Sequence, residues 1–381
     1  IYWIFGFLRM GTSGLTAQAY GAHDLKEVTR ILLRSNSISL MLALALLILQ
    51  YPIRLIAFEL IDTSAEVQQL ATLYFHICIW GAPATLGLYS FSGWFIGMQN
   101  SRFPMFIAIT QNIVNIVASL LFVFVFGMKV EGVALGTLIA QYAGLFMAYL
   151  LWLRYYRPLR KYISRKQLFT HDAMKRLFQV NRDIFLRTLC LVAVTVFFTS
   201  TGAAFGDVVL AVNTLLMQLF TLFSYIMDGF AYAGEALTGK YIGAGNRQEL
   251  QRTIRHLFGW GIALSLAFTL LYGIGGKEFL GLLTNEQSVI SASGDYFYWV
   301  LAIPLAGFAA FLLDGICIGA TSTNIMLKAM VVASGSFFLI YYSLHNVLHN
   351  HALWLGFIVY LALRGIMQAL LLNSSSLRTA R

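Results

Sequence analysis

The sequence predicts an all-α integral membrane protein built from two related halves. Of its 381 residues, 59% are hydrophobic and only 11% are charged, a composition that excludes an ordinary soluble domain. Apolar runs of about 20 residues recur along the chain, and each ends in a short polar segment, as expected of helices that cross a bilayer. Part of the first half of the sequence is also recognisable again in the second half, which indicates a duplicated unit.

The internal repeat has an ungapped offset of 222 positions (237 − 15 = 222). The matches cluster at the ends of the apolar runs and at glycines. Because these positions determine where helices stop and how closely they pack, their agreement indicates a duplicated fold. The clearest matches are Leu237–Thr238 with Leu15–Thr16, Gly243–Ala244 with Gly21–Ala22, Glu249 with Glu27, Gly315 with Gly93, and Gly319 with Gly97.

Taken in order, the apolar runs predict eleven transmembrane helices. Helix 208–243 matches helix 1–20 only from about residue 223 onward, and helix 177–204 would match positions before Ile1. We therefore expect two six-helix lobes in a complete chain, with 11 of 12 helices present here and the N-terminal helix missing. The expected helices are 1–20, 31–57, 67–98, 103–127, 131–156, 177–204, 208–243, 253–274, 288–318, 324–344 and 351–373.

The repeat also predicts the domain organisation. We expect an N-lobe over residues 1–157, holding transmembrane helices 2–6, and a C-lobe over residues 177–375, holding helices 7–12. Residues 158–176 form the expected cytoplasmic linker loop, which is rich in Lys and Arg and lies next to anionic headgroups. Residues 376–381 form a cytoplasmic tail.

Lys and Arg in the loops predict the orientation. One side of the expected bundle has 19 of them and the other has only Arg54, Lys129 and Lys277. Positive charge favours the cytoplasmic side, so the first side is predicted to face the cytoplasm. The Lys and Arg residues of the cytoplasmic loops account for the formal net charge of +10. We therefore expect no nucleic-acid partner.

Ionisable residues within the apolar runs are the first candidates for a site, because such groups are costly inside a membrane. Asp183 and Arg187 are four residues apart, a spacing that favours a structural ion pair on one helix. For Asp228, Glu235 and Asp314 we favour a functional role, because the repeat places uncharged residues at the matching positions: Gly6, Ser13 and Ser92.

Other polar residues have two open interpretations. Asn115 and Ser119 in one expected helix, and Asn213 in another, are explained equally well by hydrogen bonds between helices and by ligand binding. His345, His349 and His351 are expected in a short external loop and not at a metal site. The chain has no Walker loop and no G-x-S-x-G or H-E-x-x-H motif, so we expect neither an enzyme nor an ATP-driven transporter.

Several stretches resemble one family. FLRMGTSGLTAQAYGA (residues 7–22), NRDIFLRT (181–188), DGFAYAGEA (228–236), LDGICIGAT (313–321) and HALWL (351–355) are similar to multidrug and toxic compound extrusion (MATE) transporters, in particular to the DNA-damage-inducible F (DinF-type) branch. The resemblance implies two lobes related by a pseudo-two-fold axis, alternating access, and export of organic cations or amphiphilic toxic compounds by antiport with H⁺ or Na⁺.

The resemblance also implies the partners and the location. They are a small-molecule drug or toxic amphiphile and the membrane lipid, for a monomer in the bacterial cytoplasmic (inner) membrane with no cofactor beyond the coupling ion. In this branch the fifth helix has an asparagine and, four residues on, an aspartate, and the matching residues here are Asn115 and Ser119. The expected substrate- or cation-binding residues are Asn115, Ser119, Asn181, Asp183, Asn213, Asp228, Glu235 and Asp314.

We expect Asp228, Glu235 and Asp314 to converge on one polar cavity, with Asn213 near them. A desolvated carboxyl holds a proton more readily, so proton and cationic substrate can exchange at it. The alternative is a lipid-linked oligosaccharide flippase of the same superfamily, which would use cationic residues such as Arg9, Arg182 and Arg187 to bind pyrophosphate.

The orientation can be tested by labelling with cysteine. In intact cells, a membrane-impermeant thiol reagent should label a Lys277→Cys variant and leave an Arg160→Cys variant unlabelled, because positive loops remain in the cytoplasm. The reverse labelling pattern would overturn the orientation.

Overall fold

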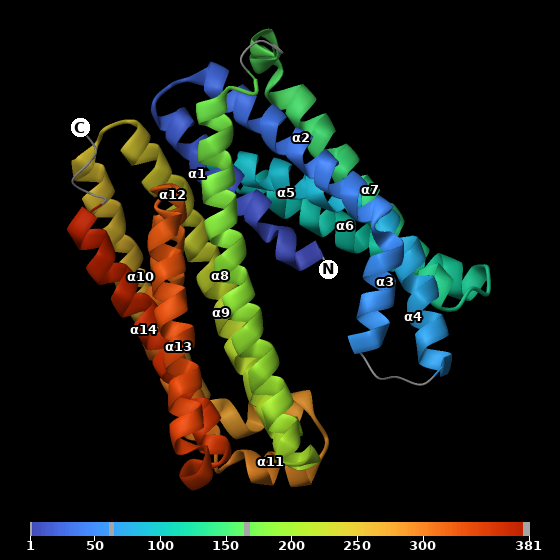
Figure 1. Ribbon diagram of the computed structural model, residues 1–381, viewed down its shortest axis with the longest axis vertical. Helices are drawn as coiled ribbons and strands as arrows, with labels where there is room; N and C mark the ends of the chain where they lie inside the picture. The colour runs from blue at the N-terminus through green and yellow to red at the C-terminus, as the bar shows by residue number, and fades with distance from the viewer. Residues whose placement is uncertain (1, 61–64, 164–167, 376–381) are drawn as a thin grey trace. The chain divides into compact units, whose positions relative to one another are not determined.

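The computed structural model describes residues 2–60, 65–163 and 168–375, which form helices and the turns between them (Figure 1). The chain divides into two compact units, Ile1–Arg176 and Leu177–Arg381. The helices of the first unit are α1 (Phe7–Gly21), α2 (Leu25–Ile48), α3 (Gln50–Leu60), α4 (Ala65–Cys78), α5 (Ala82–Gly97), α6 (Arg102–Leu120) and α7 (Val130–Tyr155). Those that follow are α8 (His171–Ala204), α9 (Asp207–Gly243), α10 (Arg247–Leu283), α11 (Gln287–Ser293), α12 (Phe297–Gly319), α13 (Thr323–Leu348) and α14 (Asn350–Ser375).

Ten helical segments in the described part of the chain are long and apolar enough to cross a membrane. The expected helix 1–20 appears as a 3₁₀ turn, Tyr2–Gly6, followed by α1. Backbone polar groups cannot be left unsatisfied in hydrocarbon, and helices satisfy them internally. The predicted all-α membrane fold is therefore confirmed.

The two units use the same pattern of helix packing. In the first unit α5 packs on α1, α2 and α7, and α6 packs on α7. In the second unit α12 packs on α9, α10 and α14, and α13 packs on α14. The offset of 222 converts each contact of the first unit into its counterpart in the second. The duplication seen in the sequence is thus a duplication of tertiary structure.

Glycines set the closest helix contact in each unit. A Cβ atom at Gly93 of α5 would lie 2.2 Å from the carbonyl oxygen of Arg9, and a Cβ at Gly315 of α12 would lie 2.2 Å from the carbonyl oxygen of Ala231. Real Cβ atoms do not approach an oxygen so closely, so only glycine permits these backbones to meet. Arg9 and Ala231 are themselves repeat partners (231 − 9 = 222).

Turns and caps repeat as well. Asp24 caps α2 through a hydrogen bond from the Glu27 amide of 2.9 Å, and Asn246 caps α10 through the Glu249 amide at 3.1 Å. Each cap satisfies an amide that would otherwise have no partner in the first turn. Positive φ also recurs at repeat partners: His23 and Gly245, Gln99 and Thr321, and Gly127 and His349.

Three expected helices are interrupted. Helix 31–57 is divided at Leu49 into α2 and α3, helix 67–98 is divided by a 3₁₀ turn (Ile79–Gly81), and helix 288–318 is divided into α11 and α12. Pro83 explains the second break, because its ring has no N–H and would clash with the carbonyl four residues earlier. Polar residues and prolines occur at these breaks, among them Gln50, Pro52 and Pro83, but the apolar residues around them favoured one continuous span in each case.

The expected linker 158–176 is not a simple loop. Its described part includes a 3₁₀ helix, Arg157–Tyr162, and α8 already begins at His171 rather than at 177. The carbonyl of Leu168 accepts a hydrogen bond from Nε of Arg34 in α2, and Arg34 also pairs with Glu27. The described part of the linker is therefore held against the first unit.

The outer helices of the two units are covered to different extents. Only Ile107 is buried in α6, whereas eight residues are buried in its counterpart α13. In the second unit Phe197 of α8 packs against Phe337 and Tyr341 of α13, with ring centroids 6.0 and 5.1 Å apart. Asn112 of α6 is exposed, whereas Gly11 and Thr12 of α1 are buried.

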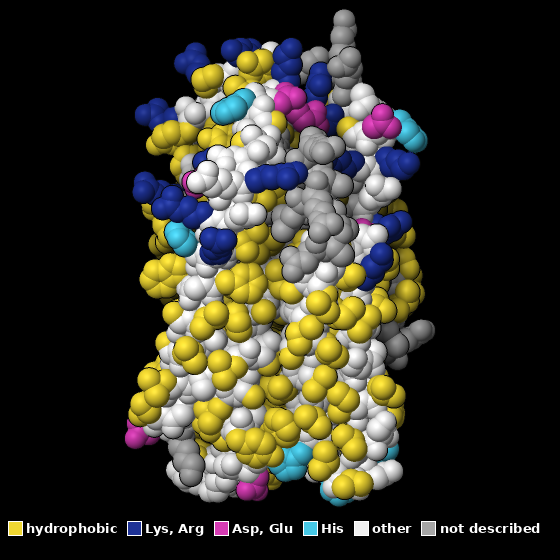
Figure 2. Space-filling model, turned by 90° about the vertical axis from the view of Figure 1, so that its left-hand side faces the viewer, with side chains coloured by type: hydrophobic (Ala, Val, Ile, Leu, Met, Phe, Trp, Pro, Cys, Tyr) yellow, Lys and Arg dark blue, Asp and Glu magenta, His cyan; other side chains and the backbone are white. Residues whose placement is uncertain are grey.

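Charged side chains are distributed as the sequence predicts. Figure 2 shows Lys and Arg gathered toward one end of the visible face, with a broad hydrophobic region below them. A protein in a bilayer presents apolar side chains at the depth of the hydrocarbon and places its basic residues at the interface. This surface is that of a membrane protein.

Replacing Gly315 with alanine should destabilise the second unit, because its new Cβ would overlap the Ala231 carbonyl. Overpacking of this kind costs about 1–3 kcal/mol, which would appear as a lower melting temperature in detergent. The matched control is Gly335→Ala on α13, where nothing lies within 4 Å and alanine favours the helix. Equal stability of the two variants would contradict the proposed contact.

Candidate functional site

Asp314 of α12 is a buried acid with three hydrogen-bond donors around it. Its Oδ2 accepts hydrogen bonds from Arg187 of α8 and from Nη2 of Arg364 of α14 (2.7 Å), and its Oδ1 accepts from Nε2 of Gln368 (2.6 Å). Asp314 is 6% exposed and Arg364 is 2% exposed. Because buried charges need partners, the carboxylate and the two guanidinium groups stabilise one another. They join α8, α12 and α14.

The expected ion pair between Asp183 and Arg187 is wrong. Arg187 reaches across to Asp314, and Asp183 pairs with its neighbour Arg182 at 2.9 Å. Asp183 also accepts a hydrogen bond of 3.2 Å from Thr323 at the start of α13. Spacing along one helix predicted the wrong partner because the deeply buried Asp314 needs compensation that only a neighbouring helix can supply.

Asn213 belongs to a second polar cluster, at the start of α14. It exchanges two hydrogen bonds with Asn350, of 2.8 and 2.9 Å, and its Oδ1 also accepts from Nε1 of Trp354 at 2.9 Å. All three side chains are buried. Buried amides whose hydrogen bonds are made within the protein fix the position of one helix against another, so Asn213 has a structural role.

The expected proximity of Asn213 to Asp228 and Glu235 is also wrong. These residues lie on one continuous helix, α9, and a helix rises 1.5 Å per residue, which separates Asn213 from Asp228 by roughly 22 Å. Asp314, unlike Asn213, lies near the two acids of α9. Its neighbour Gly315 packs against the backbone of Ala231, a residue between Asp228 and Glu235 in the sequence. Asp228, Glu235 and Asp314 therefore lie at neighbouring levels of the bundle.

The acids on α9 differ in accessibility. Asp228 is half-buried, whereas Glu235, two turns further on, is 1% exposed. The nearby backbone is tightly packed, because a Cβ at Gly319 would lie 2.4 Å from the Glu235 carbonyl oxygen. Of the three acids at this level, Asp228 is the most exposed.

The remaining predicted site residues lie on other helices. In the first unit Asn115 donates to Thr137 at 3.3 Å and accepts from Ser119 at 3.4 Å, so Asn115 and Ser119 are adjacent, as their spacing predicts. In the second unit Asn181 of α8 is 7% exposed. Its buried Oδ1 has no hydrogen-bond partner among the described residues.

Sequence reasoning missed several partners in these clusters. Thr323, Asn350 and Gln368 lie on helices other than those of the predicted residues that they contact. No local sequence pattern distinguishes them. Trp354 lies within a stretch that was recognised for its resemblance alone. Arg364 was recognisable as a base in an apolar run, although its partner was not.

The histidines are not arranged as expected. The predicted loop is reduced to His349, because α13 ends at Leu348 and α14 begins at Asn350. His345 stacks on Tyr341, and Nδ1 of His351 accepts a hydrogen bond of 3.2 Å from Trp299. In the part of the chain that the structure describes, no three His, Cys, Asp or Glu side chains are grouped as metal ligands.

Comparisons with known proteins agree with this fold. A family model described as MatE matches residues 1–121 and 184–342. The DNA damage-inducible protein F of Escherichia coli (strain K12) is 37% identical over 369 residues, which cover 95% of this chain and 79% of that protein. Protein DETOXIFICATION 42 of Arabidopsis thaliana is 23% identical, over 81% of this chain and 59% of its own length. The chain thus spans less than two thirds of that plant relative.

A solved structure has the same fold at lower sequence identity. The crystal structure of a MATE protein in the bent conformation superposes with a TM-score of 0.85 at 21% identity. The superposition covers 98% of this chain and 84% of that one. At this identity the likeness concerns the fold.

Removing the charge of Asp314 should destabilise the protein rather than inactivate it selectively. An Asp314→Asn variant leaves Arg187 and Arg364 buried without their anion, and breaking a buried pair in this way costs about 3–5 kcal/mol. Glu249→Gln is the matched control, since both members of its pair with Arg252 are exposed, at 37% and 67%, and such a pair contributes about 1 kcal/mol or less. A normal melting temperature for Asp314→Asn in detergent would refute this role.

Proposed function

This chain belongs to the multidrug and toxic compound extrusion (MATE) family, in the branch of the DNA damage-inducible protein F, and on that premise we propose that it is a secondary active efflux transporter. Its cargo is an organic cation or another amphiphilic toxic compound, exported by antiport with H⁺ or Na⁺. The proposal places it as a monomer in the lipid of the bacterial cytoplasmic membrane, with access alternating between the two sides.

One observation supports this function above the others: α9 has two carboxyls, Asp228 and Glu235, inside a membrane-spanning segment. Acids at this depth normally face a bundle interior or an aqueous cavity. Asp314 forms ion pairs with Arg187 and Arg364. Binding of a coupling ion or a cationic substrate at Asp314 would therefore leave these two buried positive charges without their anion. The half-buried Asp228 is the better position for exchange between a coupling ion and a cationic substrate.

The exchange follows from simple electrostatics. A cationic substrate stabilises the ionised carboxylate, and an incoming proton or Na⁺ competes with it for the same group. When one coupling ion enters for each monovalent cation that leaves, the two charges cancel, and the concentration gradient of the coupling ion drives export with about 1.4 kcal/mol per tenfold difference. The membrane potential adds about 2.3 kcal/mol per 100 mV only for each further charge that enters. Both contributions require that the two ligands do not bind together.

The flippase alternative receives less support from the second unit. It requires cationic side chains that are available for a pyrophosphate group. Arg187 is buried and bound to Asp314, so its charge is already compensated. Arg182 remains largely exposed, and it pairs with Asp183.

Asp228→Asn should abolish coupled transport while preserving the fold, because asparagine is nearly isosteric but has no negative charge. Purified protein in liposomes that contain a pH-sensitive dye should release protons when tetraphenylphosphonium is added, and the variant should release none. Glu278→Gln, at the end of α10, is the matched control and should retain the wild-type rate.

A parallel measurement with Na⁺-loaded liposomes identifies the coupling ion. Release of Na⁺ in place of protons would assign Na⁺ antiport. If the wild-type protein releases neither ion in response to the drug, the antiport proposal is wrong, and if Asp228→Asn retains wild-type exchange, the carboxylate is not its site.

A further inference from the structure

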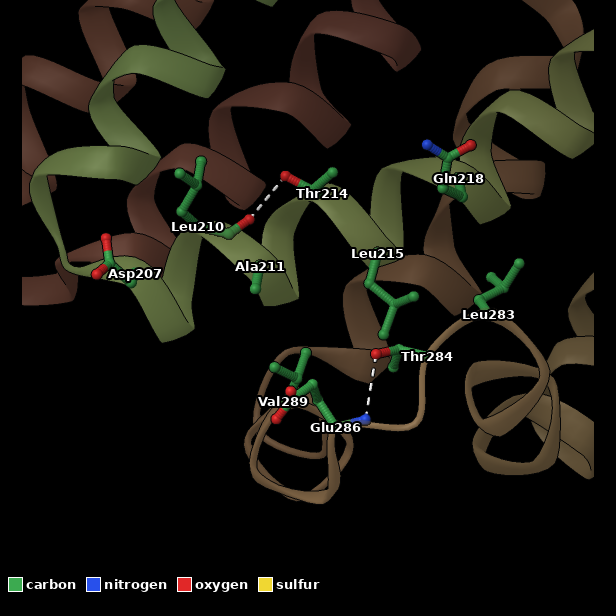
Figure 3. Close-up of a pocket in the computed structure, with 10 residues that line it drawn as sticks. All are labelled: Asp207, Leu210, Ala211, Thr214, Leu215, Gln218, Leu283, Thr284, Glu286 and Val289. Atoms are coloured by element: carbon green, nitrogen blue, oxygen red, sulfur yellow. Dashed lines mark hydrogen bonds between the residues drawn. The ribbon is translucent and has the colours of Figure 1, made fainter.

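A cavity in the second unit lies apart from the acids described above. It has a volume of about 620 Å³ and lies between the first turns of α9, the end of α10 and the start of α11 (Figure 3). This volume falls within the range of about 300–1,000 Å³ that is typical of small-molecule sites. All its lining residues belong to one unit: Asp207, Leu210, Ala211, Thr214, Leu215, Gln218, Leu283, Thr284, Glu286 and Val289.

The walls combine two carboxylates with an apolar surface. Asp207 and Glu286 are exposed acids, and no Lys or Arg stands among the described residues that line the cavity. Leucine and valine side chains form much of the remaining wall, and Figure 3 shows Leu215 extending from α9 toward Thr284. This combination suits a ligand that has a positive charge and a hydrophobic body, because the charge meets the carboxylates while the body leaves water.

Helix capping does not account for these acids. Asp207 lies in the first turn of α9, and Glu286 is the residue before α11, where a carboxylate favours the helix dipole. The Glu286 side chain nevertheless makes no capping hydrogen bond, and its backbone N–H donates to Thr284 Oγ1 at 3.2 Å. Neither carboxylate has an ion-pair partner in the described ranges. Both remain available to a ligand.

Polar residues continue from the cavity along α9. Thr214 and Gln218 are exposed within the membrane-spanning segment. The Thr214 hydroxyl donates to the Leu210 carbonyl at 2.8 Å, whereas an exposed amide such as that of Gln218 is unfavourable against lipid. Polar residues recur every seven positions, at Asp207, Thr214, Thr221 and Asp228. A seven-residue step rotates the face of a helix by only about 20°. One face of α9 therefore leads from this cavity toward Asp228.

We propose that this cavity is a second binding subsite for lipophilic monocations, at the end of the second unit that the charge distribution assigns to the outside. Cargo released from the level of Asp228 occupies it before leaving the protein. The proposal relies on the efflux function above for its direction of transport, but the binding itself requires no gradient. Since the cavity belongs to one unit alone, it remains intact when the units move relative to each other.

The charge preference can be measured chemically at Thr214. In the full chain with Cys78, Cys190 and Cys317 replaced by alanine, a Thr214→Cys variant should react about tenfold faster with a cationic methanethiosulfonate than with its anionic analogue, because two nearby carboxylates attract the first and repel the second. Tetraphenylphosphonium should slow both reactions, and tetraphenylborate, its anionic counterpart in shape, should not.

Three comparisons make the test decisive. Adding Asp207→Asn and Glu286→Gln should remove the charge preference, whereas adding Glu278→Gln should preserve it. Equilibrium binding of tetraphenylphosphonium to the otherwise native protein should weaken about tenfold in the Asp207→Asn/Glu286→Gln variant, by the same loss of attraction. Equal reaction rates with no protection, or unchanged binding in that variant, would overturn the subsite. Charge preference without drug-stimulated ion release would instead overturn the efflux function and leave the subsite standing.

Discussion

The second unit depends on the compensation of charge around Asp314. Two helices that are distant from α12 in the sequence supply the partners of its one buried carboxylate: Arg187 comes from α8, and Arg364 and Gln368 come from α14. In a low-dielectric interior each partner is costly without the others, so the positions of α8, α12 and α14 are linked. The first unit has Ser92 and Tyr142 at the positions that match Asp314 and Arg364, and it has the same helix packing without this charged cluster.

The sequence predicted the parts of the fold that depend on local or repeated features. Hydrophobic length predicted the spans, and the repeat predicted contacts such as those of Gly93 and Gly315, since a glycine at a helix crossing has the same steric purpose in both copies. The breaks before Pro83 and near Gly294 are marked in the sequence by the proline and by the polar segment 291–295, but the apolar residues around each break favoured a single span. Residues 376–381, expected to form a tail, lie outside the described residues.

The candidate site was predicted less well, because its partners come from different helices. Unusual residue types identified Asp228, Glu235 and Asp314, since acids are rare in apolar runs. Their contacts required the structure: Arg187 is bound across the bundle rather than along its own helix, and Asn213 joins α14. A one-dimensional spacing gives the face of a helix, but it does not show which neighbour that face meets.

The two sides of α9 at its first turns differ in burial, and under the proposed efflux function this difference affects which substitutions can alter cargo binding. Val212, Asn213 and Leu216 are buried and hold the helix in the bundle, while Leu210, Thr214 and Gln218 line the cavity. Substitutions on the cavity side change the shape and polarity of the cavity wall, and they have little effect on the free energy of unfolding. If the cavity binds cargo as proposed, a new cargo can select changes on this surface one residue at a time, without compensating changes elsewhere in the protein.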